Sequence, residues 1–250
     1  MRSVGLEFGP NFFASYYFSD MEGEQFVSVN KSPRLSSNET DANSEHLSPL
    51  YGIVHSAAWT LIPEAAFNEN EKEKYLLFST AARQDSIVTY DRLLALNAVV
   101  VYNADLLAEQ FVDQLYPGLR LRHAAGLFIE IAIRMQGLSK DDHIYIHQVA
   151  NQFIVLVFKA GKVHLANHLE TSHSEDVRYY VLYTMKNLEL PESTSLILVG
   201  QAAENLALIT GLKTFLPNVE AIDNPFGKKK LTEPNFDAVH FLGLYTPLCA

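Results

Sequence analysis

Two stretches of this chain, residues 7–18 and 147–158, align position by position without a gap. Three identities hold the alignment: Asn11 with Asn151, Phe13 with Phe153, and Phe18 with Phe158. In each copy an apolar strand ends, small or polar residues form a turn, and a second apolar strand begins. A strand–turn–strand unit at the start of each half predicts two similar half-molecules that face each other across a cleft. We place these halves at residues 1–138 and 139–250, with a hinge over 137–142.

Charge and composition exclude several classes of protein. The formal net charge is −10, whereas sequence-independent nucleic-acid binding depends on clustered Lys and Arg that neutralise phosphates. We interpret the basic run at 228–230 as a solvated loop. No uncharged apolar run reaches the roughly 20 residues of a membrane-spanning helix, and no signal peptide is evident. The single cysteine, Cys249, excludes an internal disulfide and fits a reducing compartment, so we expect a soluble, cytoplasmic protein.

Runs and periodicities predict a mixed α/β fold, with antiparallel strands followed by strand–helix units in each half. We expect strands over 3–30, 53–57, 59–62, 98–102, 119–122, 144–158, 163–169, 195–199 and 218–223. We expect helices opened by Pro63-Glu64, after Asn103 or Asp105, over 124–135, after a capping box at 172–175, and over 203–215 and 236–245. The polar segment 32–49 is predicted to be a loop.

Four segments resemble a known family. They are WTLIP at 59–63, NAVVVY at 97–102, EDVRYY at 175–180 and LILVG at 196–200. On these segments nearly the whole chain is similar to an uncharacterised bacterial family, domain of unknown function 3822. The chain also resembles the actin-like ATPase fold, which is built from two ribonuclease-H-like halves around a nucleotide cleft. The resemblance implies mixed sheets flanked by helices around a central cleft.

The motifs of active actin-like ATPases are only partly present. Those proteins carry an Asp-x-Gly turn in each half, where the carboxylates act on magnesium and water and the glycine lets backbone N–H groups approach phosphates. Here Glu7-Phe8-Gly9 keeps a carboxylate and a glycine, but His147 and Val149 occupy the equivalent positions of the second half. A Gly-Gly turn that packs against adenosine is reduced to Gly200-Gln201. Because phosphoryl transfer depends on positioning and electrostatic stabilisation, these departures argue against efficient ATP hydrolysis.

The resemblance nevertheless implies a degenerate site for ATP or ADP with magnesium. Glu7 would be its catalytic, metal-directed carboxylate. The nucleotide-binding candidates are Gly9, Asn11, His147, Asn151, Gly200 and Gln201. The alternative interpretation makes Glu7 a solvent-facing strand residue and Gly9 a turn former.

Other combinations of residues give weaker indications of a functional site. His143 with His147, and His164 with His168, would lie about 13 Å apart on strands, too far to share one metal, so we predict no metal site and expect solvent-facing histidines. A two-residue turn at Ala160-Gly161 would place all four on one face. No triad motif or Walker-type loop is present, and Tyr179, Tyr180 and Tyr183 are interpreted as packing or interface residues.

Three functions stay open at this point. The first is a non-hydrolysing nucleotide-binding or scaffold protein with an unknown protein partner. The second is a weak ATPase or sugar-kinase-like phosphotransferase. The third is a purely structural homodimer.

Overall fold

The computed structural model describes residues 2–9, 12–21, 24–32, 48–77, 86–119, 121–222 and 230–231. Within these ranges the chain forms two compact units. Unit 1 comprises the described residues up to 127 together with 230–231, and unit 2 comprises residues 128–222. The two compact units divide inside the helix that runs from Ala124 to Gln136. The boundary between the two predicted halves, after residue 138, stays a prediction.

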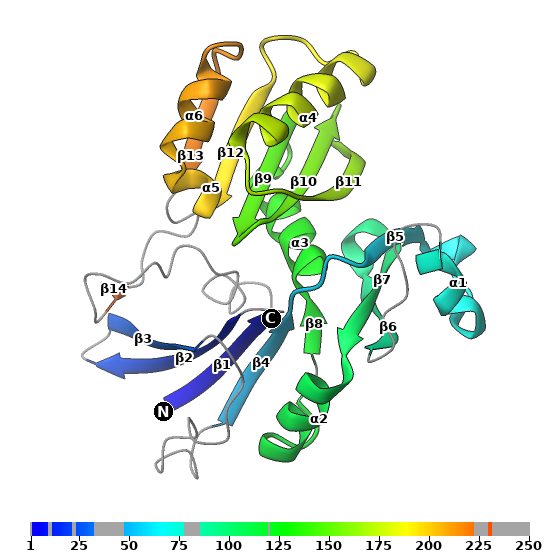
Figure 1. The fold of residues 1–250 in the computed structure, drawn as a ribbon, viewed down its shortest axis with the longest axis vertical. Helices are drawn as coiled ribbons and strands as arrows, with labels where there is room; N and C mark the ends of the chain where they lie inside the picture. The colour runs from blue at the N-terminus through cyan, green and yellow to red at the C-terminus, as the bar shows by residue number, and fades with distance from the viewer. Residues whose placement is uncertain are drawn as a thin grey trace. The chain divides into compact units, whose positions relative to one another are not determined.

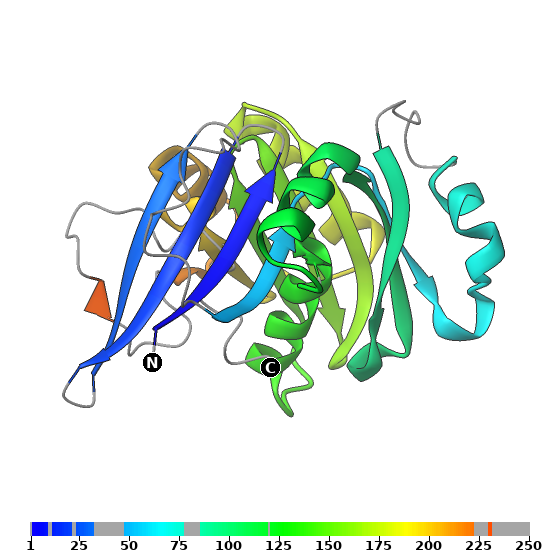
Figure 2. The same ribbon diagram turned by 90° about the horizontal axis from the view of Figure 1, so that it is seen from below.

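Unit 1 contains a six-stranded sheet in the order β14-β3-β2-β1-β4-β8 (Figures 1 and 2). Its strands are β1 (Arg2–Gly9), β2 (Phe12–Met21), β3 (Glu24–Ser32), β4 (Ser48–Val54), β8 (Leu121–His123) and β14 (Lys230–Leu231). β1 to β3 are antiparallel, while β4 is parallel to both β1 and β8. The predicted loop over 32–49 therefore ends earlier than expected, because β4 already begins at Ser48.

A second sheet of unit 1 has the order β5-β7-β6 and is antiparallel. Its strands are β5 (Trp59–Pro63), β6 (Ser86–Leu93) and β7 (Ala98–Asp105). The prediction did not include β6. The helix expected at Pro63 was wrong in part, since 3₁₀ turns over Glu64–Ala66 and Glu69–Glu71 come before α1 (Lys72–Leu77). α2 (Leu106–Leu115) and α3 (Ala124–Gln136) follow β7 and β8 as predicted.

Unit 2 is a five-stranded sheet in the order β11-β10-β9-β12-β13, with helices packed on it (Figure 1). The strands are β9 (His143–Val149), β10 (Gln152–Lys159), β11 (Lys162–Glu170), β12 (Ser195–Gly200) and β13 (Val219–Ile222). The first three form the predicted antiparallel meander, and β12 is parallel to both β9 and β13. Its helices are α4 (Ser174–Asn187), α5 (Gln201–Glu204) and α6 (Leu206–Lys213).

Both units contain the same five-strand arrangement. In each unit three antiparallel strands come first, and a fourth strand then pairs in parallel with the first strand and with a fifth. The resulting orders are β3-β2-β1-β4-β8 in unit 1 and β11-β10-β9-β12-β13 in unit 2. The repeated hairpins also agree in register, because Gly9 pairs with Phe12 and Val149 pairs with Gln152. The prediction of two similar mixed α/β halves is confirmed at this level.

Two details of unit 2 differ from the prediction. The single helix expected over 203–215 is broken at Asn205, whose backbone is not helical. The side chain of Asn205 caps α6 by accepting from the N–H of Leu208. The capping box at 172–175 is also wrong, because α4 begins after His173, which makes no side-chain cap. The helix predicted over 236–245 lies outside the described residues, as does Asn11. None of the helices in the described part of the chain has the length and apolar character needed to cross a membrane.

Candidate functional site

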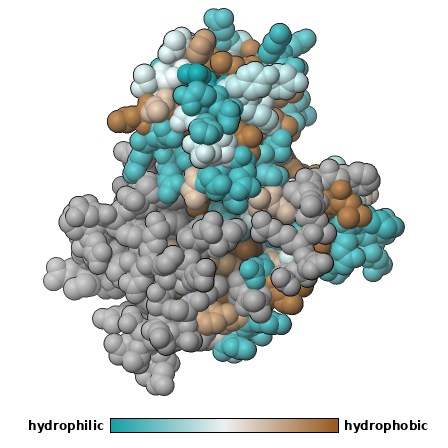
Figure 3. Space-filling view, in the orientation of Figure 1, coloured by the Kyte–Doolittle hydropathy of each residue, from teal (hydrophilic) through white to brown (hydrophobic). Residues whose placement is uncertain are grey.

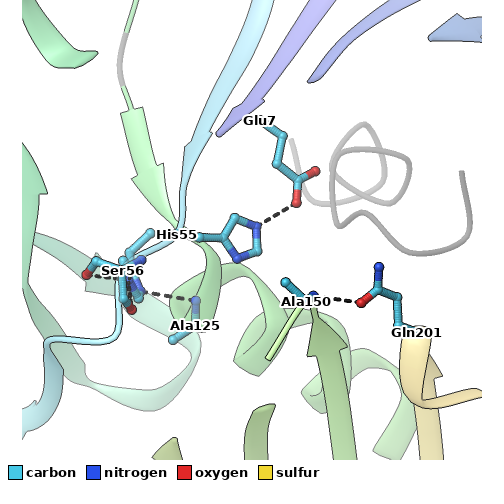
Figure 4. Close-up of polar contacts among 7 residues, drawn as sticks. Glu7, His55, Ser56, Ala125, Ala150 and Gln201 are labelled. Carbon is cyan, nitrogen blue, oxygen red and sulfur yellow. Dashed lines mark hydrogen bonds and ion pairs between the residues drawn. The ribbon is translucent and has the colours of Figure 1, made fainter. Parts of the chain in front are cut away.

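Glu7 lies on β1 and has no exposed surface. Its Oε1 accepts a hydrogen bond from Nε2 of His55 at 2.6 Å (Figure 4). The sheet register explains this contact, because β1 and β4 are parallel and His55, the residue after β4, donates its backbone N–H to the carbonyl of Phe8. The interpretation of Glu7 as solvent-facing is therefore wrong. The carboxylate is held inside unit 1 by a buried histidine.

A second buried polar group of unit 1 centres on His123, the last residue of β8. Its Nδ1 accepts from the N–H of Ala125 at 3.1 Å and so caps the start of α3. Its backbone N–H donates to Oδ2 of the buried Asp91 at 2.6 Å, and its Nε2 lies 3.2 Å from Oγ of Ser56. In a nucleophilic triad Nδ1 would instead donate to the carboxylate. Ser56, His123 and Asp91 are therefore a structural group that fixes the start of α3.

In unit 2 the β9–β10 turn is closed by side chains of the same unit. The N–H of Ala150 donates to Oε1 of Gln201 at 2.6 Å (Figure 4). Nε2 of Gln148 donates to the carbonyl of Ala150 at 2.9 Å. Asn151, at the tip of the turn, donates from Nδ2 to Oε1 of Glu170 at 3.0 Å. Each N–H donor named here has a partner within the unit.

Gly200 ends β12 with a φ of 69° and a ψ of −145°. A Cβ at this position would lie 2.8 Å from the carbonyl oxygen of Gln148 and 3.0 Å from Cδ2 of His147. Glycine is needed here because β12 and β9 approach each other closely at their ends. His147 is buried and its ring contacts that of Phe128 at 5.2 Å between centroids. The expectation of a solvent-facing histidine is wrong at this position.

Two other histidines of unit 2, His164 and His168, lie on β11. Two of the four histidines predicted to share one face of the sheet are seen to do so, because His147 and His168 both lie opposite Ile154. His164 is exposed and is the extra residue where the β10–β11 register shifts. Among the residues that the structure describes, no three or more His, Cys, Asp or Glu side chains come together in a way that would hold a metal ion.

Some predicted site residues are brought together and others are separated. His147, Gly200 and Gln201 meet around the ends of β9 and β12, whereas Asn151 is directed to Glu170. Glu7 and the half-buried Gly9 belong to unit 1. The sequence interpretation missed His55, which lies 48 residues from Glu7 along the chain and carries no motif of its own. Only the register of β1 and β4 reveals the pair.

Three of the described groups that the resemblance assigns to ATP or ADP with magnesium already have other contacts within their own unit. The carboxylate expected to act on the metal accepts from His55 at 2.6 Å. The N–H of Ala150, in the turn equivalent to the phosphate turn of active members, donates to Gln201. The glycine expected to admit adenosine instead admits His147 and Gln148. Each group is engaged within its own unit.

Comparison with solved structures defines the class of fold. The chain is similar to a protein of Bacteroides thetaiotaomicron VPI-5482 with an actin-like ATPase fold and unknown function, at a TM-score of 0.79 and 21% identity over 100% of this chain and 96% of that one. It is also similar to the PilM–PilN type IV pilus biogenesis complex, at a TM-score of 0.57 and 14% identity over 100% of this chain and 98% of that one. The protein therefore has the actin-like ATPase fold, as predicted.

The family follows from the sequence comparison. Residues 35–219 match the model of the family described as protein of unknown function, DUF3822, and the chain belongs to that family. A search of curated proteins found no match.

Proposed function

We propose that this protein is a non-hydrolysing scaffold of the actin-like ATPase fold that works by binding another protein. The observation that carries the proposal is the 2.6 Å hydrogen bond from the N–H of Ala150 to Oε1 of Gln201. In an active actin-like ATPase the equivalent turn N–H would donate to a phosphate oxygen. Here the carboxamide oxygen of Gln201 accepts that hydrogen bond instead. A turn whose donor is already satisfied has nothing to gain from a nucleotide phosphate.

The state of Glu7 supports the same conclusion. Phosphoryl transfer requires fixed donors and a metal that neutralises developing charge. The Glu7 carboxylate is fully buried and one of its oxygens accepts from His55, so the residues around it would have to move before it could act on a metal or a water. Moving a buried partner away from a carboxylate costs several kcal/mol. Turnover would therefore begin from an unfavourable rearrangement.

The expectation of a protein partner is supported by one similar structure. PilM, which shares the fold, is found in a complex with PilN of type IV pilus biogenesis. An actin-like scaffold that acts by protein binding therefore has a precedent, although no partner is assigned to this chain by that likeness. The second candidate function is nucleotide binding without turnover.

The hydrogen bond itself is tested by amide exchange at Ala150. Gln201→Ala removes the acceptor, so we expect the Ala150 amide to exchange faster than in the wild-type protein. Gln110→Ala, at an exposed glutamine of α2, is the matched control and should leave this rate unchanged. Equal exchange rates at Ala150 in all three proteins would show that Gln201 does not hold the turn.

The function is tested by calorimetric titration with ATP and ADP, with and without magnesium, followed by a phosphate-release assay. We expect no binding at about 1 mM nucleotide and no release above a protein-free blank. Binding without release that disappears in Gly9→Val would replace the scaffold proposal by the nucleotide-binding form. Phosphate release that falls in Glu7→Gln would overturn the proposal in favour of a weak ATPase or phosphotransferase.

A further inference from the structure

The outer face of α4 carries two exposed tyrosines. Tyr179 and Tyr183 are 70% and 52% exposed, and their rings stack with centroids 6.0 Å apart and an interplanar angle of 16°. α4 packs on the sheet of unit 2 through Val177, Val181 and Met185. At 100° per residue the tyrosines lie on the opposite side of the helix from these core residues. They therefore contribute nothing to the core of unit 2.

Figure 3 shows the surface of unit 2 on the side that faces the viewer. The face of unit 2 in Figure 3 is mostly teal and pale, with small brown areas. Tyrosine is enriched at protein interfaces because its ring buries apolar area while its hydroxyl stays hydrogen-bonded. A stacked pair on a polar surface is a small, rigid contact of this kind.

Charged residues lie at both ends of the tyrosine pair. Glu175 precedes Tyr179 by four residues and Lys186 follows Tyr183 by three, so each is about one helical turn away on the same face. Both side chains are exposed. The outer face thus runs from an acid through two aromatic rings to a base. We call these four residues the α4 stripe.

The α4 stripe is complementary to itself when a second helix runs antiparallel. A two-fold axis between Tyr179 and Tyr183 would set Tyr179 against Tyr183 of the second copy. The same axis would set Glu175 against Lys186 of the second copy, and the reverse. The midpoints of the two residue pairs differ by only half a residue, or about 0.75 Å of helix rise. One axis therefore satisfies the aromatic and the ionic contacts together.

We propose that the α4 stripe docks a second copy of this chain in an antiparallel, two-fold pairing of α4 helices. This pairing does not depend on whether the turns of either unit hold nucleotide. Two-fold pairing is the commonest way in which identical chains associate, because the same patch serves both partners. A partner of a different sequence has no reason to carry charges that match the α4 stripe at both ends.

The dimer should be weak. From their exposed fractions, the four tyrosines of two copies would bury roughly 400–600 Å². That area falls below the roughly 1,200 Å² at which specific, stable interfaces begin. We therefore expect a dissociation constant of about 10–100 µM.

Glu175 and Lys186 also suit the dipole of their own helix, since acids are favourable near an N-terminus and bases near a C-terminus. The experiment must separate that local role from pairing. Charge reversal does so, because each single reversal would set like charges together at both ends of the dimer. A mixture of the two reversed proteins would restore opposite charges at both ends.

The test is sedimentation equilibrium of the full chain from about 1 µM to about 500 µM. We expect Glu175→Lys and Lys186→Glu each to weaken the wild-type dimer by at least about tenfold. An equimolar mixture of the two should return to within about threefold of wild-type affinity. Lys213→Glu, in the last turn of α6 and outside the stripe, is the matched control and should behave as wild type.

Two further measurements complete the design. Tyr179→Ser combined with Tyr183→Ser should abolish the dimer, and far-UV circular dichroism of every variant checks that α4 is still folded. A wild-type chain that stays monomeric at the highest concentration overturns the proposal and leaves the stripe to a different protein. A charge reversal that leaves dimerisation intact also overturns the proposal, as does a mixture of the two reversed proteins that fails to dimerise.

Discussion

Gly200→Ala tests why the end of β12 carries a glycine. The new Cβ would lie 2.8 Å from a backbone oxygen, that of Gln148, and 3.0–3.1 Å from two ring atoms of the buried His147. The backbone φ of 69° and ψ of −145° also fall where residues with a Cβ are strained by about 1–3 kcal/mol. Overpacking against a strand and a buried ring adds about 1–3 kcal/mol. We expect unit 2 to lose about 2–5 kcal/mol of unfolding free energy.

Gly137→Ala separates backbone strain from crowding. Gly137 has a φ of 55°, but its nearest neighbour to an added Cβ is 3.9 Å away. This control should lose only the left-handed backbone penalty of about 1–2 kcal/mol. Urea unfolding followed by circular dichroism gives both values, and hydrogen exchange at β9 and β12 assigns the loss in Gly200→Ala to unit 2. Equal losses in the two variants would refute the close approach of β9 and β12 as the reason for Gly200.

Two further predictions concern buried polar groups. His55→Ala removes the 2.6 Å partner of a carboxylate with no exposed surface and should lower the unfolding free energy of unit 1 by about 3 kcal/mol in urea titrations, whereas His164→Ala, at an exposed histidine, should change it little. Burial holds the pKa of His168 below its ordinary 6.5, against an opposing effect of Glu170. The stability that neutral His168 contributes is therefore present above pH 6.5 and is lost as the pH falls through the lowered pKa. Thermal melts of His168→Gln should show a smaller decrease on acidification than the wild type, and an identical pH profile would contradict the assignment.

Much of the fold was predictable because it repeats. The aligned stretches place Gly9 with Phe12 and Val149 with Gln152 in equivalent hairpin pairs, and the strand order on either side of each hairpin is the same. Apolar runs located β7 and β12, where burial is nearly continuous along the strand, and α3, whose first six residues are all buried. One error falls where a polar side chain decides the backbone. Asn205 caps α6 and so divides a run that is apolar enough to be one helix.

The candidate site was less predictable, because its chemistry depends on contacts between distant residues. Glu7 on an alternating strand is compatible with either face until β2 and β4 pair on both sides of β1. His55 becomes its partner only through the parallel register of β4. Gln201 was interpreted as a lost second glycine. Its side chain in fact reaches the β9–β10 turn across 51 residues of sequence, and no local pattern signals that reach.

The internal partners of Ala150 and Glu7 bear on how such a protein is stabilised. A chain that needs nucleotide to satisfy a turn N–H gains stability by RT ln(1 + [L]/Kd) when nucleotide binds. Here the N–H of Ala150 is satisfied by Gln201, and one oxygen of the Glu7 carboxylate accepts from His55, so these two groups already have partners. Nucleotide would have to displace these partners, and its net gain would be the difference between two similar sets of hydrogen bonds. A β9–β10 turn that Gln201 holds keeps its arrangement without a ligand, as the proposed scaffold function requires.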